Sequence, residues 1–248
     1  MLGIIGGSGL GELGNLEGAQ RQTVRTPYGE PSGPLTFGRL RGREVVFLAR
    51  HGDGHTIPPH KVNYRANIWA LRDRGVANIV SIASVGGIRA DLVPGTLVLP
   101  DQIIDYTHGR SATYFDQTDR SVTHIDFTQP YCDALRGRIA AAAAAVGELA
   151  IDGATYAATQ GPRLETAAEI NRLERDGADL VGMTAMPEAA LARELELCYA
   201  MIAVVVNAAA GRDGSSNGVS LDAINAVARL AMARVCRVLD ELAGGNDC

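Results

Sequence analysis

The sequence lacks any apolar stretch that approaches the roughly 18 residues needed to span a membrane. It also lacks a run of lysine and arginine, and the net charge over 248 residues is −5. We therefore expect neither a membrane partner nor a nucleic-acid partner. The first ten residues, "MLGIIGGSGL", contain no basic segment and no cleavage site, so they do not predict a secretory signal.

Cysteine is scarce, and its four positions are far apart in the sequence. Cys132, Cys198, Cys236 and Cys248 form no CxxC pair. Isolated cysteines of this kind are typical of a reducing compartment and do not form a zinc ribbon. The pattern predicts unpaired thiols and a cytoplasmic protein.

Histidines suitable for a metal site are also lacking in the required arrangement. His51, His55 and His60 follow one another in a segment broken by glycine and proline, so they share no helical face. No nearby cysteine or glutamate completes a set of ligands. We expect no metal, and these histidines could equally serve packing or the surface.

Apolar runs that read as buried strands alternate with amphipathic helical patterns. The strand-like runs are 2–5, 43–49, 78–84, 96–100, 178–183 and 198–207, and the helical patterns are 61–75, 166–177, 187–197 and 221–243. Such alternation predicts an α/β fold with a mixed, mainly parallel central sheet flanked by helices on both faces. No segment has the composition of a linker, so we expect one domain over residues 1–248.

The first strand leads into a glycine-rich turn, "IIGGSGLGELG", of the kind that exposes backbone N–H groups to an anion. A Walker loop would end in Gly-Lys-Ser/Thr, and no lysine is present. Gly9, Gly11 and Gly14 match the dinucleotide pattern, but the match begins four residues after the strand. The second strand also ends in Arg50 and His51 rather than in a ribose-binding carboxylate. A phosphate-sized nest with the Ser8 hydroxyl remains, or else a turn with no ligand.

Other strand ends carry groups that suit an anion. Arg50 follows the second strand and could bind a phosphate through two hydrogen bonds. The third strand ends in "IASVGGI", and "VGMTAMPE" brings Met183 and Thr184 to the start of a helix. The last strand ends in Asn207, which either starts a turn or reads a polar ring at the carboxyl edge of the sheet.

Taken together, these segments resemble the trimeric purine nucleoside phosphorylase and methylthioadenosine phosphorylase family. The resemblance covers essentially the whole chain: "IIGGSGL", "TPYGEPS", "LARHG", "VNYRANIWAL", "YFDQT", "QGPRLET", "GADLVGMTAMPE" and the strand into Asn207. It implies a nucleoside phosphorylase-like fold and a pentosyltransferase that uses inorganic phosphate as co-substrate, with no cofactor.

The resemblance also implies a role for particular residues. Phosphate would bind at Ser8, Arg50, His51, the Ala83–Ser84 backbone and Thr184. The nucleoside would meet Met183 at the sugar, Glu165 and Asn207 at the base, and Ala208, Ala209, His55 and Leu221 around them. His51, Glu165 and Asn207 would act in catalysis, and His124 would reach a neighbour's site, which suggests a homotrimer.

Three positions predict the substrate. A 6-oxopurine offers an acceptor at O6 and a donor at N1, which suits Asn207 and Glu165. In the adenine-cleaving branch of the family that the chain resembles, the position matching Glu165 looks like Ser and the position matching Asn207 looks like Asp. Members that bind ordinary nucleosides have a His where this chain has Leu221, and an apolar residue suits a 5′-methylthio group, although Leu221 could simply be a core residue. The combination predicts 5′-methylthioinosine, cleaved to hypoxanthine and 5-methylthioribose 1-phosphate.

Four alternatives remain open. Cleavage of inosine or guanosine differs only at Leu221, whereas a methylthioadenosine phosphorylase would require Asn207 to tolerate the 6-amine. A dinucleotide-dependent oxidoreductase conflicts with the end of the second strand. A binding module without catalysis has no need for Arg50 and four anion-compatible strand ends.

Overall fold

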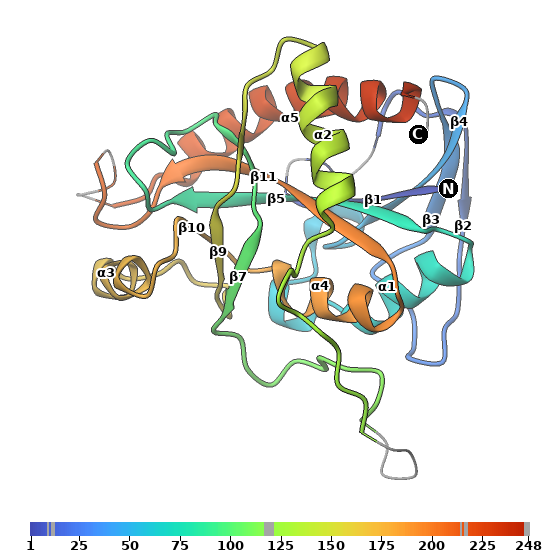
Figure 1. The fold of residues 1–248 in the computed structure, drawn as a ribbon, viewed down its shortest axis with the longest axis horizontal. Coiled ribbons are helices and arrows are strands. Elements are labelled where there is room, and N and C mark those ends of the chain that lie inside the picture. Colours follow the sequence, from blue (N-terminus) through green and yellow to red (C-terminus); the bar gives the residue numbers. More distant parts are fainter. Residues whose placement is uncertain (9, 11–12, 117–121, 214, 216–217, 246–248) are drawn as a thin grey trace.

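Four parallel strands form the centre of a mixed sheet in the computed structural model, which describes residues 1–8, 10, 13–116, 122–213, 215 and 218–245. They are β1 (Leu2–Gly6), β4 (Arg43–Ala49), β5 (Asn78–Gly87) and β11 (Cys198–Ala208). Their order in the sheet is β4–β1–β5–β11, and each neighbouring pair is parallel. Each of the four was predicted from its apolar run, and the α/β fold class is confirmed (Figure 1).

Further strands extend this centre and make the sheet mixed. The predicted strands β10 (Leu180–Gly182) and β6 (Leu97–Leu99) lie antiparallel to β5 and β11. Five strands were not predicted: β2 (Glu17–Gln22), β3 (Leu35–Leu40), β7 (Gln102–Asp105), β8 (Ala150–Asp152) and β9 (Thr155–Ala158). β7, β8 and β9 are only three or four residues long, β2 is exposed throughout, and polar residues and a glycine interrupt the apolar residues of β3 (LTFGRL). These strands therefore have no long apolar run and depend on pairing with neighbours.

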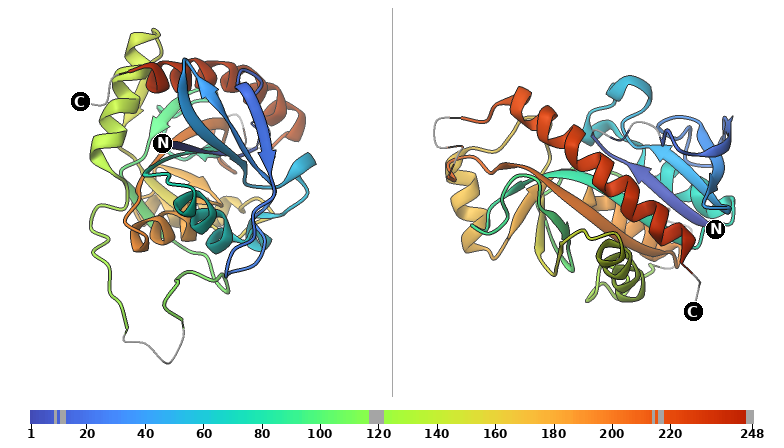
Figure 2. Two further views of the ribbon diagram at one scale, coloured as in Figure 1. Left: turned by 90° about the vertical axis from the view of Figure 1, so that its right-hand side faces the viewer. Right: turned by 90° about the horizontal axis from the view of Figure 1, so that it is seen from above.

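Helices cover both faces of the sheet. The pair α1 (Tyr64–Asp73) and α4 (Ala185–Glu194) lies on one face, and the pair α2 (Asp133–Ala145) and α5 (Leu221–Gly244) on the other (Figure 1). Figure 2 shows α5 lying lengthwise along the sheet. Helix α3 (Ala167–Arg175) stands at the end near β9 and β10 and begins with a capping box between Thr166 and Glu169.

The side chains of β11 divide the core between the two faces. Tyr199, Met201 and Val205 belong to the cluster on the α1–α4 side. Ile202 and Val204 belong to the cluster on the α2–α5 side. Because a strand buried on both faces needs apolar residues at every position, the uninterrupted run in the sequence predicted β11 as a buried strand.

The cysteine prediction was wrong for two of the four residues. Cys132, which precedes α2, and Cys198, which begins β11, form a disulfide with their Cα atoms 5.3 Å apart. The Cys132 amide also donates to the Tyr199 carbonyl, so this contact holds α2 against β11. Their separation of 66 residues in the sequence gave no sign of it. Cys236 is a free thiol, and Cys248 lies outside the described residues.

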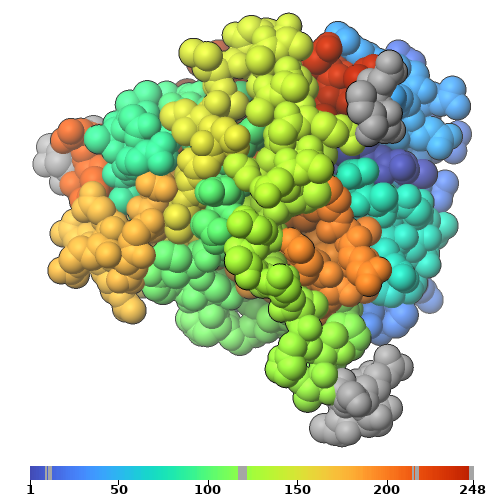
Figure 3. Space-filling view, viewed as in Figure 1, coloured from blue at the N-terminus to red at the C-terminus, as the bar shows by residue number. Residues whose placement is uncertain are grey.

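The segment between β7 and α2 leaves the body of the molecule. Its described parts extend outward in Figures 1 and 3. The outgoing part is tied down by Tyr114, whose amide donates to Glu194 in α4, and by Asp116, which pairs with Arg65 in α1. Among the described residues, none of the helices combines the length and the apolar character needed to cross a membrane.

Candidate active site

A cavity of about 960 Å³ opens where the central parallel strands end. Its walls come from the residues that follow β1 and β4 and from the last residues of β5 and β11. This is the edge at which open α/β sheets bind ligands. Nine of the predicted site residues line it: Ser8, His51, His55, Ser84, Glu165, Met183, Asn207, Ala209 and Leu221.

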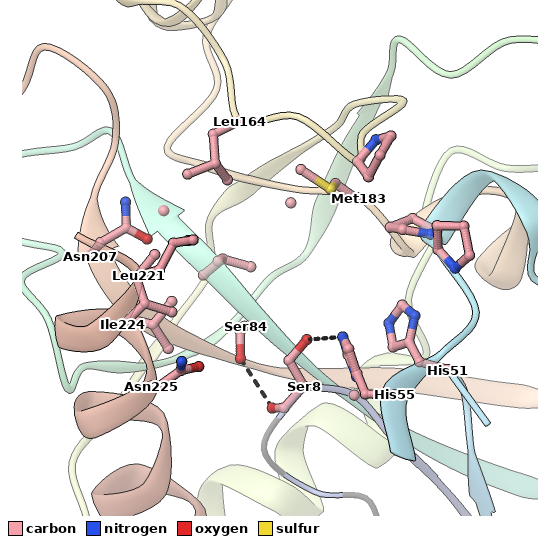
Figure 4. Close-up of a pocket in the computed structure, with 18 of the residues that line it drawn as sticks. Ser8, His51, His55, Ser84, Leu164, Met183, Asn207, Leu221, Ile224 and Asn225 are labelled. Atoms are coloured by element: carbon pink, nitrogen blue, oxygen red, sulfur yellow. Dashed lines mark hydrogen bonds between the residues drawn. The ribbon is translucent and has the colours of Figure 1, made fainter. Parts of the chain in front are cut away.

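Figure 4 shows Ser8, His51 and His55 together at one side of this cavity, with Asn207 and Leu221 at the other. Five predicted residues are not part of its wall: Arg50, Ala83, Thr184, Ala208 and His124. Of these, Arg50, Ala83 and Thr184 are buried just behind the wall. Gly9 and Gly11 of the glycine-rich turn lie outside the described residues.

Arg50 is completely buried and is paired with a carboxylate that the sequence reasoning did not single out. Its Nε and Nη2 donate to the two oxygens of Glu188 at 2.7 and 2.8 Å, and both side chains are fully buried. Ser81 and Tyr199 also donate to Glu188, each at 2.8 Å. Burial alone would lower the pKa of Arg50, but the Glu188 carboxylate more than offsets it and raises that pKa. The guanidinium is therefore a fixed cation.

Only one N–H of Arg50 is left for a ligand among the described contacts. Besides the Glu188 bonds, Nη2 donates to Ser81 and one Nη1 hydrogen donates to the Ile82 carbonyl at 2.9 Å. The second Nη1 hydrogen remains. A β-carbon placed on Gly7 would lie 2.9 Å from this Nη1 and 2.4 Å from the Ile82 oxygen. Glycine is thus required where the cavity wall passes over the guanidinium.

His51 is held in one tautomer. Its Nδ1 lies 2.8 Å from the Ile57 carbonyl, which can only accept, so Nδ1 carries the proton and Nε2 is left as an acceptor. Burial, and then the charge of Arg50, lower the pKa of His51 to about 4. The same two causes lower the pKa of His55, whose ring centroid is 4.4 Å from that of His51. Both rings are therefore neutral at pH 7.

Two serines complete this side of the cavity. The Ser8 hydroxyl lies 3.4 Å from Nε2 of His55, and the Ser84 hydroxyl donates to the Ser8 carbonyl at 3.2 Å (Figure 4). Thr184, the N-cap of α4, is buried, and its amide donates to the Tyr156 hydroxyl at 3.3 Å. The result is a concentration of hydroxyl groups and a buried cation, which suits an anion with several oxygens.

Glu165 and Asn207 also line the cavity. Glu165 accepts a hydrogen bond from the Thr159 hydroxyl at 2.6 Å through Oε1, which leaves Oε2 without a described donor. The register of β11 against its partner strand β5 shifts between Val205 and Asn207, which marks a β-bulge. The strand continues to Ala208, one residue beyond the predicted end. The bulge, rather than the strand end, sets the direction of the amide.

The Asn207 amide already has one partner. Its Nδ2 donates to the Ala208 carbonyl at 2.7 Å. One amide hydrogen therefore remains for a ligand, together with Oδ1, which no described residue engages. Donation to both N7 and O6 of a purine at once would require this bond to be given up.

The wall near Leu221 is apolar but open. Val219, Leu221 and Ile224 line the cavity at the start of α5, and Leu164 lines it as well. Leu221 is 66% exposed and Leu164 41% exposed. Asn225, one helical turn after Leu221, adds an exposed amide to this wall. His124 is exposed on the projecting segment and does not line this chain's cavity.

Among the described residues, no group of three or more histidine, cysteine, aspartate or glutamate side chains could hold a metal ion. The sequence did not identify two residues of this region. Glu188 pairs with Arg50, and Arg110 donates to the backbone carbonyl of Met183. Glu188 ends the segment "VGMTAMPE", but a lone glutamate near a helix start gives no sign of its partner 138 residues away.

Comparisons with known proteins agree on the kind of enzyme. A profile described as "Phosphorylase superfamily" matches residues 1–243. The chain is 57% identical over 209 residues to the "Probable S-methyl-5'-thioinosine phosphorylase" of Pseudomonas syringae, covering 84% of this chain and 85% of that one. It is 48% identical over 218 residues to the "6-oxopurine nucleoside phosphorylase" of Pyrococcus furiosus, covering 86% and 81%.

A solved structure is similar over almost the whole chain. The methylthioadenosine phosphorylase of Schistosoma mansoni, solved in complex with adenine, matches with a TM-score of 0.92 at 33% identity, covering 98% of this chain and 90% of that one. The prediction of a nucleoside phosphorylase-like fold and of a pentosyltransferase is confirmed. By sequence and by fold, the chain belongs to the phosphorylase superfamily.

Proposed function

We propose that the protein cleaves the N-glycosidic bond of 5′-methylthioinosine with inorganic phosphate, releasing hypoxanthine and 5-methylthioribose 1-phosphate. The observation that carries this proposal is the combination of three chemistries in one cavity. Ser8 and His51 suit phosphate, Glu165 and Asn207 suit a 6-oxopurine, and the apolar wall at Leu221 suits a methylthio group. Relatives such as the Pseudomonas syringae protein carry the corresponding name.

At the phosphate end, we assign binding to Ser8, Arg50, His51, the Ala83–Ser84 backbone and Thr184. The remaining Nη1 hydrogen of Arg50 donates to one phosphate oxygen past Gly7. Neutral His51 offers only a lone pair at Nε2, so it accepts from the hydrogen of HPO₄²⁻. The bound anion then lies on the face of the sugar opposite the base.

At the base end, the C1′–N9 bond breaks as a C1′–O bond to phosphate forms. Negative charge develops on the departing purine, which takes up a proton from water at N7, while the proton that HPO₄²⁻ carried is released to water as the sugar 1-phosphate dianion forms. The remaining amide hydrogen of Asn207 donates to O6 and stabilises this charge, and its Oδ1 accepts from N7 once N7 is protonated. Oε2 of Glu165 accepts from N1–H. Met183 packs against the sugar, and Ala208, Ala209 and His55 complete the surroundings of the nucleoside. Holding both reactants in line supplies much of the remaining acceleration.

The open wall at Leu221 supports a homotrimer. A methylthio group beside a 66% exposed leucine would remain in contact with water in an isolated chain. His124 is exposed on the projecting segment, and the family resemblance assigns it to the site of a neighbouring copy. We therefore propose that each site is completed by the neighbour's His124. Sedimentation would show the trimer, and His124→Ala would raise the KM for the nucleoside without changing the KM for phosphate.

Inosine is the second candidate substrate. The Pyrococcus furiosus relative is named for 6-oxopurine nucleosides in general. Asn225 lies in the wall beside Leu221, and its amide could serve a 5′-hydroxyl. A methylthioadenosine phosphorylase fits less well, because Glu165 has no proton to accept from N1 of adenine.

Phosphate dependence tests the proposed reaction. Release of hypoxanthine from methylthioinosine should require phosphate, produce a sugar 1-phosphate and continue in the presence of EDTA. Release of the base in phosphate-free buffer would indicate hydrolysis instead. Loss of activity in EDTA, restored by a divalent ion, would indicate a metal enzyme.

A further inference from the structure

Arg110 has an unusual set of partners for a partly buried cation. Nη1 donates to the carbonyls of Met183 at 2.7 Å and Met186 at 2.6 Å. Nη2 donates to the carbonyls of Thr159 at 3.2 Å and Gln160 at 2.9 Å. No carboxylate among the described residues forms an ion pair with it. Four carbonyl groups therefore replace the usual counter-charge.

These carbonyls belong to only two segments, and both segments carry the proposed site. Thr159 and Gln160 follow β9 and lead into the loop of Glu165. Met183 and Met186 span the junction between β10 and α4, which contains Thr184. Arg110 thus binds the base-reading segment and the sugar- and phosphate-facing segment with one guanidinium.

The carbonyls need such a donor because regular structure does not use them. Met186 has φ −114° and ψ 138°, so its carbonyl lies outside the hydrogen-bond ladder of α4. The Thr159 amide donates to the Gly182 carbonyl at 2.8 Å, and this bond joins the two segments on one side. Arg110 joins them on the other.

The link from Arg110 to Glu165 is short. Arg110 binds the carbonyl of Thr159, and the hydroxyl of the same residue donates to Oε1 of Glu165 at 2.6 Å. The Nε of Arg110 also contacts Oε1 of Gln160 at 3.3 Å, which keeps the next residue in place. A displacement of Thr159 would therefore move the carboxylate that faces the base.

We propose that Arg110 is a positioning residue, which fixes Glu165 relative to Met183 and so sets the fit of the base over the sugar. This inference rests on the proposed nucleoside phosphorolysis. A planar guanidinium can serve four carbonyls in two directions, whereas the lysine ammonium has three donors at one point. Without the guanidinium, we expect the residues that bind the base to be less well fixed, while the phosphate site stays intact.

The experiment compares Arg110→Lys and Arg110→Ala with Arg65→Ala. Arg65 is the matched control, because it binds Asp116 and the Thr113 carbonyl of the same projecting segment and contacts neither site segment. Each variant is assayed with methylthioinosine and methylthioadenosine, with the phosphate KM measured separately. Wild-type turnover is established first, so its absence would refute the proposed function rather than the role of Arg110.

We expect Arg110→Lys to lower kcat/KM for methylthioinosine at least tenfold and to reduce its preference over methylthioadenosine, with the phosphate KM within about twofold of wild type. Guanidinium at millimolar concentration should partly restore Arg110→Ala. Arg65→Ala should keep wild-type kinetics even if it melts at a lower temperature. The proposal is overturned if Arg110→Lys keeps both the rate and the preference, or if the phosphate KM rises as much as the nucleoside KM.

Discussion

At one end of the cavity, Arg50 and Glu188 are fully buried and form two hydrogen bonds with each other. Four more hydrogen bonds join this pair to Ser81, Ile82 and Tyr199. At the other end, Leu221 is 66% exposed on the first turn of α5. The proposed phosphate site is built into the core, whereas the proposed 5′ site lies on a surface that this chain leaves open. Substitutions at the first end should therefore damage both folding and turnover. Substitutions at the second should change substrate preference alone.

The largest effect is expected at Arg50. Arg50→Met leaves the Glu188 charge buried without a partner, which costs about 3–5 kcal/mol of stability. Turnover should fall by more than about a hundredfold if a preorganised charge is lost. Urea unfolding and the phosphate KM measure the two effects.

A double variant separates stability from catalysis at this end. Arg50→Met with Glu188→Leu removes both charges and should recover much of the stability while remaining inactive. Recovery of turnover in the double variant would show that Arg50 has no role in binding phosphate.

Asn207→Asp is expected to have the next largest effect. It sets a carboxylate against O6 of a 6-oxopurine, which costs about 1–3 kcal/mol, or ten- to a hundredfold or more in kcat/KM for methylthioinosine. The relative rate with methylthioadenosine should rise, and the change to an adenine preference should also need Glu165→Ser. If the ratio of the two kcat/KM values stayed constant in a folded, phosphate-binding variant, Asn207 would serve only the β11 bulge.

The pH dependence of stability tests the burial of His51. Its pKa is lowered from 6.5 to about 4 in the folded chain, so the unfolded chain binds the proton more readily. The contribution of neutral His51 to the stability of the folded chain is present above pH 6.5 and is lost as the pH falls toward 4. Between pH 7 and pH 4.5 the loss from this one group is about 2 kcal/mol. His51→Gln should lose correspondingly less stability than wild type over the same range in phosphate-free buffer.

The smallest effect is expected at the open end. Leu221→His adds a hydrogen-bonding group for a 5′-hydroxyl and removes apolar contact with the methylthio group. Because one such group is worth about 1–3 kcal/mol, the preference for methylthioinosine over inosine should fall about tenfold or more. Leu230→His is the control, since Leu230 lies on the same helix, is 76% exposed and does not line the cavity. An equal change in both variants would place the effect outside the cavity.

The same contrast between the two ends explains what the sequence could predict. The central strands and the residues at their ends were recognisable, because burial on both faces requires long apolar runs and the motifs are local. Glu188, the bulge before Asn207 and the Cys132–Cys198 disulfide depend on contacts between distant segments, which leave no periodic pattern. The exposure of Leu221 was equally hidden, because a leucine after a helix cap reads as core.

The ratio of kcat/KM for methylthioinosine to that for inosine, measured at saturating phosphate, tests the central proposal most directly. Contact of a methylthio group with Leu221, Val219 and Ile224 predicts a ratio of at least about ten in the wild-type protein. A ratio near one, with phosphate-dependent release of hypoxanthine from both nucleosides, would contradict the assignment of the 5′ wall and identify a general 6-oxopurine nucleoside phosphorylase.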